Sequence, residues 1–142
     1  MTSTVREMLR GKSNVHTVEP ETTVFEALRL MADKNIGAVL VHSDQRLHGI
    51  FSERDYARKV ILLGKASRET LVKEIMTSPV ISVEPHWTAD ECMALMTQKR
   101  VRHLPVMEQG RLVGVISIGD VVRAVVDHQQ FTIDSLQRYI TS

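Results

Sequence analysis

The 142-residue chain is poor in cysteine and in aromatic residues, and each shortage excludes a class of protein. Cys92 is the single cysteine, so no disulfide can form within the chain. One Trp, two Tyr and three Phe offer little platform on which nucleic-acid bases could stack. No apolar run approaches the roughly 20 residues needed to cross a membrane, and a net charge of +1 gives no general attraction to nucleic acid or lipid. We therefore expect a cytoplasmic protein without nucleic-acid or membrane partners.

Residue sets typical of enzymes and metal sites are also missing from the sequence. The six histidines lack metal-ligand spacing, and there are no paired cysteines. Neither a Gly-x-Ser-x-Gly motif nor a phosphate-binding Walker loop occurs. We expect no catalytic activity, no metal and no catalytic cofactor.

What the chain has instead is an internal repeat with a constant offset of 65 residues. Gly49-Ile-Phe-Ser-Glu-Arg-Asp55 returns as Gly114-Val-Ile-Ser-Ile-Gly-Asp120, and Val18-Glu-Pro20 returns as Val83-Glu-Pro85. Between 18–58 and 83–123, 15 of 41 positions are identical. A duplicated unit predicts two similar lobes around a pseudo-twofold axis, with clefts between them. A lone unit of roughly 60 residues would be marginally stable, so we expect the two to share burial.

Each repeat predicts the element order β-α-β-β-α. Glu-Pro ends a first strand, expected at 15–18 and 80–83. Capping boxes at Thr23-Val-Phe-Glu26 and Thr88-Ala-Asp-Glu91 then open a helix. Two strands joined by a short polar turn follow, and a second helix begins after each motif serine. The predicted ranges are 38–41, 47–51 and 53–63 in the first repeat, and 104–107, 112–116 and 118–128 in the second.

Two further helices are predicted outside the repeat, a connecting helix at 68–76 and an amphipathic tail helix at 131–140. The predicted fold class is α/β (α+β), with two pseudo-symmetric repeats packed sheet to sheet and a C-terminal helix. Each repeat is preceded by a lead-in, the segment that carries Val5-Arg-Glu-Met-Leu9 or Val72-Lys-Glu-Ile-Met76 and runs into the first strand. The predicted boundaries are 1–66 for the first repeat with its lead-in, 67–128 for the second with its connecting helix, and 129–142 for the tail.

Ser52-x-x-Asp55 and Ser117-x-x-Asp120 stand where a strand gives way to a helix, and two interpretations of them are open. The structural one is a helix cap, whose side chains satisfy backbone donors. The functional one is a nucleotide site, because a carboxylate can accept hydrogen bonds from both hydroxyls of a ribose. The serine hydroxyl and the helix N-terminus suit ribose or phosphate. Two such sites facing each other across a cleft would form two nucleoside-sized pockets.

The repeated motif and its flanks resemble a known family. Gly-h-h-Ser-x-x-Asp (h is apolar) after a strand, Met-Thr-Ser-Pro-Val at 76–80 and Arg-His-Leu-Pro-Val at 102–106 are similar to a tandem CBS-domain pair, named after cystathionine β-synthase. Segments 52–58 and 131–134 resemble stand-alone bacterial members. The resemblance implies a Bateman module that binds AMP, ADP, ATP or NAD(H) as a regulatory ligand. It also implies a homodimer that signals energy or redox state to an effector protein.

Carried over by position, the resemblance implies two ligand sites. Asp55 and Asp120 would bind ribose, with Ser52 and Ser117 at ribose or phosphate. The lead-in of the opposite repeat would contact the base, through Thr77, Pro79, Val80 and Ile81 at the Asp55 site and through Asn14, Val15 and His16 at the Asp120 site. Arg102 and His103 would reach phosphate at the Asp55 site, whereas the Asp120 site would have to use Arg54.

The Asp55 site is therefore expected to bind more tightly, unless Arg102 merely pairs with a surface carboxylate. Two functions stay open at this point. The first is a regulatory module that binds an adenine nucleotide. The alternative is a ligand-free interaction and assembly scaffold, in which the Ser-x-x-Asp motifs are only helix caps.

Overall fold

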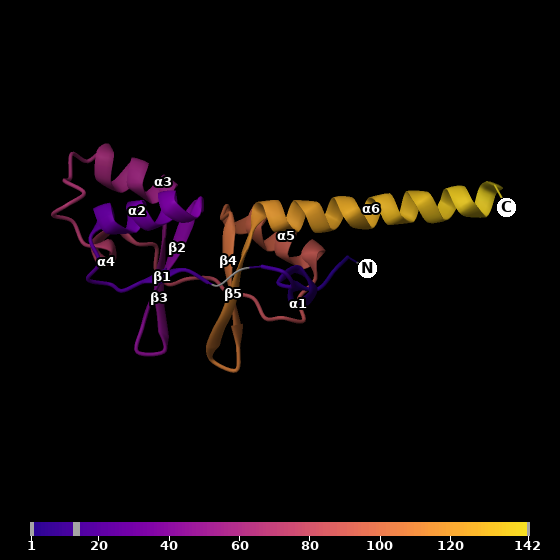
Figure 1. The fold of residues 1–142 in the computed structure, drawn as a ribbon, viewed down its shortest axis with the longest axis horizontal. Coiled ribbons are helices and arrows are strands. Elements are labelled where there is room, and N and C mark those ends of the chain that lie inside the picture. The colour runs from indigo at the N-terminus through magenta and orange to yellow at the C-terminus, as the bar shows by residue number, and fades with distance from the viewer. Residues whose placement is uncertain (1, 13–14, 142) are drawn as a thin grey trace. The chain divides into compact units, whose positions relative to one another are not determined.

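The computed structural model describes residues 2–12 and 15–141 as a mixed α/β protein with two small sheets (Figure 1). The chain divides into two compact units. The first-repeat unit is Val15–Ile81, and the second-repeat unit combines Met1–Asn14 with Ser82–Ser142. The units thus differ from the predicted boundaries at 66/67, because the lead-in segments pack into each other's repeat.

Buried contacts explain this exchange of lead-ins. Val5 is fully buried in the core of the second-repeat unit, and its N–H donates to the carbonyl of Trp87 (2.7 Å). Val72, the corresponding lead-in residue of the second repeat, is fully buried in the core of the first-repeat unit. The apolar side chains of each lead-in therefore complete the core of the other repeat.

The first-repeat unit contains a three-stranded sheet in the order β1-β2-β3. β1 (Thr17–Val18) runs parallel to β2 (Ala38–Ser43), and β2 pairs antiparallel with β3 (Arg46–Ser52). Helix α2 (Val24–Lys34) buries Val24, Ala27 and Met31 against this sheet's core. The mixed pairing is as the sequence predicted. The predicted capping box of α2 forms by half: the Glu26 N–H donates to Thr23 Oγ1, without the return bond to the Glu26 carboxylate.

The second-repeat unit repeats this plan around a two-stranded sheet. β4 (His103–Glu108) pairs antiparallel with β5 (Arg111–Ser117), and α5 (Ala89–Lys99) and α1 (Val5–Met8) complete the core. The predicted strand at 80–83 is wrong, because Val83 forms only an isolated bridge to Val106. The capping box of α5 is confirmed: Glu91 N–H donates to Thr88 Oγ1, and Thr88 N–H donates to a Glu91 carboxylate oxygen.

Tight turns join the strands of both hairpins. The two central residues have positive φ in each turn, at Asp44 and Gln45 in one and at Gln109 and Gly110 in the other. Two-residue loops with both central residues in the left-handed region match the right-handed twist of the flanking strands. The turns therefore fix the register that brings Ser52 opposite Ala38 and Ser117 opposite His103.

The predicted helix at 53–63 differs in kind from an ordinary α-helix. It begins as α3 (Glu53–Asp55) and continues as a π-helix, η1 (Tyr56–Ile61). The N–H groups of Leu62 and Lys65 donate to carbonyls five residues earlier, at Ala57 and Val60. π-helical turns are rare and frequently occur at functional sites.

The connecting helix is shorter than predicted, since α4 covers only Val72–Ile75. Carbonyl groups before Val72 already accept hydrogen bonds from another helix. Ser67 and Thr70 accept hydrogen bonds from the N–H groups of Phe25 and Val24, at the start of α2. These bonds satisfy orphan donors of α2 and leave the chain before Val72 in turns.

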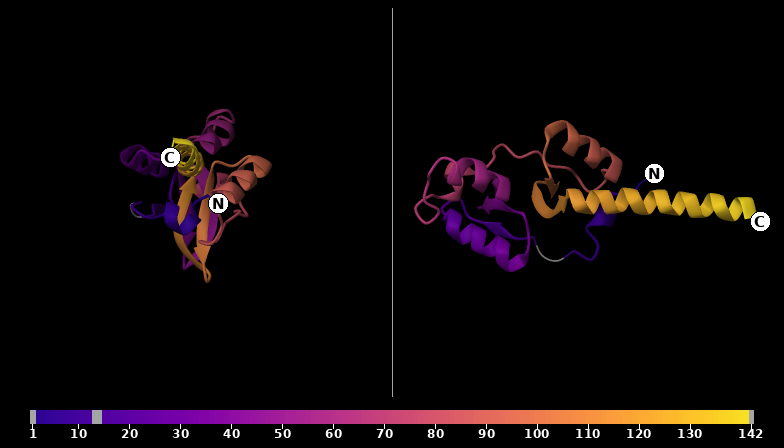
Figure 2. Two further views of the ribbon diagram at one scale, coloured as in Figure 1. Left: turned by 90° about the vertical axis from the view of Figure 1, so that its right-hand side faces the viewer. Right: turned by 90° about the horizontal axis from the view of Figure 1, so that it is seen from above.

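The predicted C-terminal helix is confirmed, but it is not separate from the helix before it: one continuous helix, α6 (Ile118–Thr141), covers both predicted segments (Figures 1 and 2). No glycine or proline lies between His128 and Phe131 to end the first segment, and Gln129 and Gln130 are good helix formers. Within the described residues, no helix combines the length and apolar content needed to span a bilayer.

Candidate functional site

The first motif places a carboxylate where β3 ends and α3 begins. Ser52 has extended backbone angles and is the N-cap of α3. Its N–H and its hydroxyl donate to Asp55 Oδ2 at 3.0 and 3.1 Å, and the Asp55 N–H donates to Ser52 Oγ at 3.2 Å. Asp55 is only 8% exposed. The capping interpretation of this motif is therefore confirmed as local geometry.

The other carboxylate oxygen of Asp55 meets the lead-in that packs into this unit. Thr77 Oγ1 donates to Asp55 Oδ1 (3.1 Å), and Lys59 Nζ lies 3.2 Å from the same oxygen. Lys59 also donates to the carbonyl of Ile75. Thr77 is held in place by two backbone hydrogen bonds to Ile50 of β3. The site thus joins a strand end, a helix start and a lead-in.

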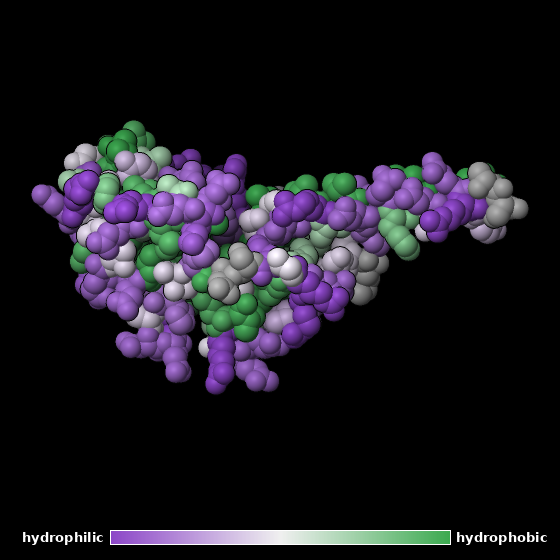
Figure 3. Space-filling view, in the orientation of Figure 1, coloured by the Kyte–Doolittle hydropathy of each residue, from purple (hydrophilic) through white to green (hydrophobic). Residues whose placement is uncertain are grey.

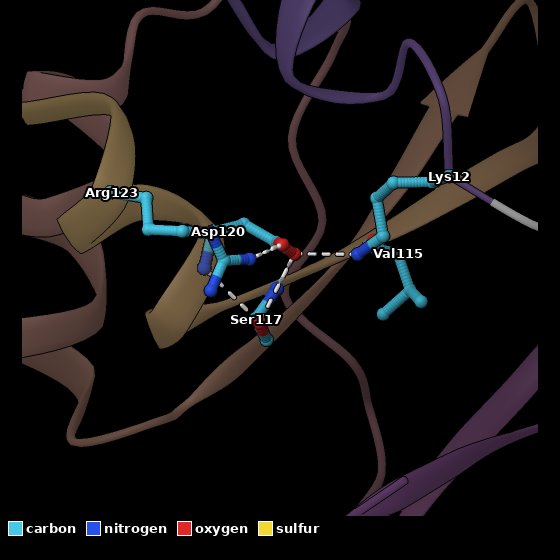
Figure 4. A network of polar contacts seen from close by, with 5 residues as sticks. All are labelled: Lys12, Val115, Ser117, Asp120 and Arg123. Atoms are coloured by element: carbon cyan, nitrogen blue, oxygen red, sulfur yellow. Dashed lines mark hydrogen bonds and ion pairs between the residues drawn. The ribbon is translucent and has the colours of Figure 1, made fainter. Parts of the chain in front are cut away.

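The second motif builds the same arrangement at the start of α6 (Figure 4). The Ser117 N–H and hydroxyl donate to Asp120 Oδ2 at 2.8 and 3.0 Å. Lys12 Nζ, from the N-terminal lead-in, donates to the same oxygen (2.5 Å) and to the Val115 carbonyl (3.0 Å). Arg123 donates to Asp120 Oδ1 (2.6 Å). Asp120 therefore contacts two cations, whereas Asp55 contacts one.

The contacts of Asp120 alter its acidity. Partial burial acts to raise the pKa of this carboxyl, but the hydrogen bonds from Lys12 and Ser117 and the positive charge of Lys12 lower it more. The net result is a pKa below the ordinary value of 3.8. The group is a carboxylate at neutral pH and can only accept hydrogen bonds, as a ribose diol would require.

The glycine that opens each motif is required by close packing of the lead-ins. A Cβ on Gly49 would lie 2.6 Å from Met76 Sδ and 2.8 Å from the Thr77 carbonyl oxygen. A Cβ on Gly114 would lie 2.6 Å from Leu9 Cδ2. At Gly49 the neighbour is backbone, so only glycine lets the lead-in approach this closely; at Gly114 the neighbour is the end of the Leu9 side chain.

Three contacting cations were missed by the sequence analysis, although simple spacing could have found them. Lys59 and Arg123 follow their aspartates by four and three residues, the separations at which helical side chains meet. Lys12 contacts Asp120 and Thr77 contacts Asp55. Lys12 and Thr77 are 65 residues apart, which is the offset of the repeat, so the two contacts come from equivalent positions.

The residues predicted for the Asp55 site are distributed over the two units. Thr77 contacts Asp55, and 79–81 follow it in the first-repeat unit. Arg54 is an exposed residue of α3. Arg102 and His103 lie beside Ser117 in the second-repeat unit, where the Ile118 N–H donates to the Arg102 carbonyl. Their assignment to the Asp55 site, and that of Arg54 to the Asp120 site, stay predictions.

The residues predicted to face Asp120 from the first lead-in are less well defined. Val15 and His16 belong to the first-repeat unit and are half-buried. Asn14 lies outside the described residues. In the described part of the chain, no cluster of His, Cys, Asp and Glu has the arrangement of a metal site.

Comparison with known proteins identifies the family of the repeated unit. Residues 5–61 and 72–127 each match the CBS domain. The chain belongs to the CBS-domain family. The matched ranges place each aspartate near the end of its CBS repeat, on the second helix, and include the lead-in in each case.

Solved CBS structures share the fold over nearly the whole chain. A candidate signal-transduction protein with CBS domains from Burkholderia ambifaria is 50% identical, with a TM-score of 0.86 over 92% of this chain and 99% of that one. A CBS-domain protein from Agrobacterium tumefaciens is 42% identical, with a TM-score of 0.81 over 86% of this chain and 98% of that one. Pairs of CBS repeats of this kind are regulatory proteins.

Curated relatives include CBS proteins from a plant and a bacterium. The mitochondrial protein CBSX3 of Arabidopsis thaliana is 42% identical over 84% of this chain, which spans 61% of that protein's length. YhcV of Bacillus subtilis is 34% identical over 76% of each chain. Because one relative is mitochondrial, the expected cytoplasmic location stays a prediction.

Proposed function

We propose that this CBS protein is a non-catalytic regulatory module that binds an adenine nucleotide, AMP, ADP, ATP or NAD(H), at Asp55 and Asp120. The observation that carries the proposal is the equivalent placement of two buried or nearly buried carboxylates, each with a serine hydroxyl and at least one cation within contact. A carboxylate can accept two ribose hydroxyls, while the adjacent lysine can turn to a phosphate.

The two sites are proposed to be unequal. Asp120 must give up contacts to two cations at 2.5 and 2.6 Å before it can bind ribose through both oxygens. Asp55 gives up one cation, Lys59 at 3.2 Å, and the neutral hydrogen bond from the Thr77 hydroxyl. We therefore assign the tighter site to Asp55, in agreement with the expected phosphate contacts of Arg102 and His103. One additional charge-assisted contact would change affinity by about tenfold or more.

Isothermal titration with AMP, ATP and NADH tests the proposal directly. Wild type should bind at least one of them, and Asp55→Asn should lose more affinity than Asp120→Asn. Absence of heat and of a thermal shift with every nucleotide would overturn the proposal.

One observation favours the scaffold alternative: in both Ser–Asp caps the backbone donors are satisfied by side chains of the motif itself. The Asp55→Asn/Asp120→Asn double variant separates the two functions. If the double variant is less stable and nucleotides have no effect on wild type, the motifs act as helix caps alone. Lost binding with a largely retained free energy of unfolding supports nucleotide sites, since a neutral amide oxygen still accepts the cap hydrogen bonds.

A further inference from the structure

The second half of α6 is a helix without tertiary burial. Its first half packs into the second-repeat unit, where Val121 and Ala124 join the core. Every residue from Gln129 to Ile140 is exposed, and the helix extends well past β4 and β5 of its unit (Figures 1 and 2). An unsupported helix of about 12 residues is marginal in water, and most helical stability comes from packing of an apolar face. This segment therefore needs a partner surface to be stable.

Most of the exposed aliphatic side chains of α6 lie along one regular stripe, which includes one polar residue, Gln129. We define the α6 seam as six positions separated alternately by four and three residues: Val122, Val126, Gln129, Ile133, Leu136 and Ile140. Its distal members are well exposed, with Ile133 at 48%, Leu136 at 57% and Ile140 at 79%. Green, hydrophobic residues accordingly recur along the projecting helix in Figure 3. A 3.5-residue period is the spacing of helices that pair along their length.

Charge along the exposed half of α6 indicates which partner fits. Between Gln129 and Ile140, two residues are charged at neutral pH, Asp134 and Arg138. Their charges are of opposite sign. A helix that lies on a lipid surface normally carries a basic polar face, which this one lacks. From Gln129 onward, the positions flanking the seam are Gln130, Thr132, Gln137 and Tyr139, none of them charged at neutral pH. Arg123, which flanks Val122, is charged but is already paired with Asp120 of its own chain.

Flanking charges normally select or reject a pairing helix, and like charges oppose self-pairing. The flanks of the α6 seam are uncharged from Gln129 to Ile140, so this part of the seam imposes no such penalty on two identical copies. The seam is also a surface that each copy can offer to the other in the same way, as a closed twofold dimer requires. We propose that two copies of the chain pair through their α6 seams.

This inference names the surface for the homodimer that the family resemblance implies, and it does not depend on nucleotide binding. The seam spans just under three heptads, so the pairing should be of micromolar rather than tighter affinity. Pairing would bury Ile133, Leu136 and Ile140 and stabilise the distal half of the helix.

Sedimentation of the full chain over a concentration series, without nucleotide, tests the proposal. Leu136→Lys should weaken self-association by at least about tenfold, because it places a charge in the seam. Phe131→Lys is the matched control. Phe131 is 70% exposed and lies on the opposite side of α6 from the seam, so this variant should associate like wild type.

Both substitutions are at exposed positions, so the core should fold in each, which near-ultraviolet circular dichroism of Trp87 can verify. Far-ultraviolet circular dichroism should show helix content rising with concentration in wild type but not in Leu136→Lys. A wild-type chain that is monomeric at every concentration, or equal effects of the two variants, would overturn the proposal. A failure of nucleotide binding in calorimetry would leave this result unaffected.

Discussion

Asp120 is the residue at which stability and the proposed ligand binding would depend on the same carboxylate. Its carboxylate satisfies the start of α6 and ties the N-terminal lead-in to that helix through Lys12. The same oxygens are those proposed to bind ribose, so bound ligand would compete with the contacts that stabilise this region.

The pH dependence of stability should report this carboxylate. Because the pKa of Asp120 is lowered in the folded state, its charged form stabilises the fold above the ordinary value of 3.8, and that contribution is lost as pH falls through the folded value. Urea unfolding should give a constant stability difference between wild type and Asp120→Asn from neutral pH to about 4, and a shrinking one below. In Lys12→Met, the acid-dependent loss should be smaller. A difference that does not change with acidification would contradict this account.

Cys92 is expected to be inert in the folded protein. It is fully buried in α5, and burial, helped by the neighbouring charge of Glu91, raises the pKa of its thiol to about 11. The thiolate is the reactive form, so both access and ionisation oppose reaction. Ellman's reagent at pH 8 should react with the native chain far more slowly than with the urea-unfolded chain. Comparable rates in the two states would be inconsistent with this packing.

At the scale of elements, the motif glycines set the distance between strand and lead-in. Gly49→Ala places its methyl group against the Thr77 backbone, whereas Gly114→Ala meets the end of the Leu9 side chain, which can move. Gly49→Ala should therefore be the more destabilising, by about 1–3 kcal/mol.

Gly119→Ala is the control for these two substitutions. Gly119 lies in the first turn of α6, and its new methyl group would have no neighbour closer than 3.5 Å. It should stabilise the fold by about 0.5–1 kcal/mol, because alanine loses less entropy in a helix. Chemical denaturation measures all three variants. Gly114→Ala proving costlier than Gly49→Ala would show that the lead-in contacts are not as described.

At the scale of the whole molecule, the exchanged lead-ins make each unit depend on a segment that belongs to the other repeat. Val5→Ala should loosen the second-repeat unit, and Val72→Ala the first-repeat unit, each by roughly 2 kcal/mol for loss of a buried side chain. Hydrogen–deuterium exchange should rise in β4, β5 and α5 for Val5→Ala, and in β2, β3 and α2 for Val72→Ala. The opposite assignment would contradict the composition of the two units.

The sequence alone determined the repeated elements and the motif geometry. Identical spacing, the Thr88 capping box and the alternation of apolar and turn residues are local signals, and local hydrogen bonding decides them. Ser52–Asp55 and Ser117–Asp120 were found for the same reason, since their partners lie within three residues.

Only the tertiary structure decided which lead-in completes which core and which cations contact the aspartates. Lys12 and Asp120 are 108 residues apart, and no local preference brings them together. The π-helical turn after Asp55 and the uninterrupted α6 were also decided at this level. The free energy gained by burying Val5 and Val72 depends on the apolar area removed from water and not on separation along the chain. Each valine can therefore pack in the core of the other repeat and not in that of its own.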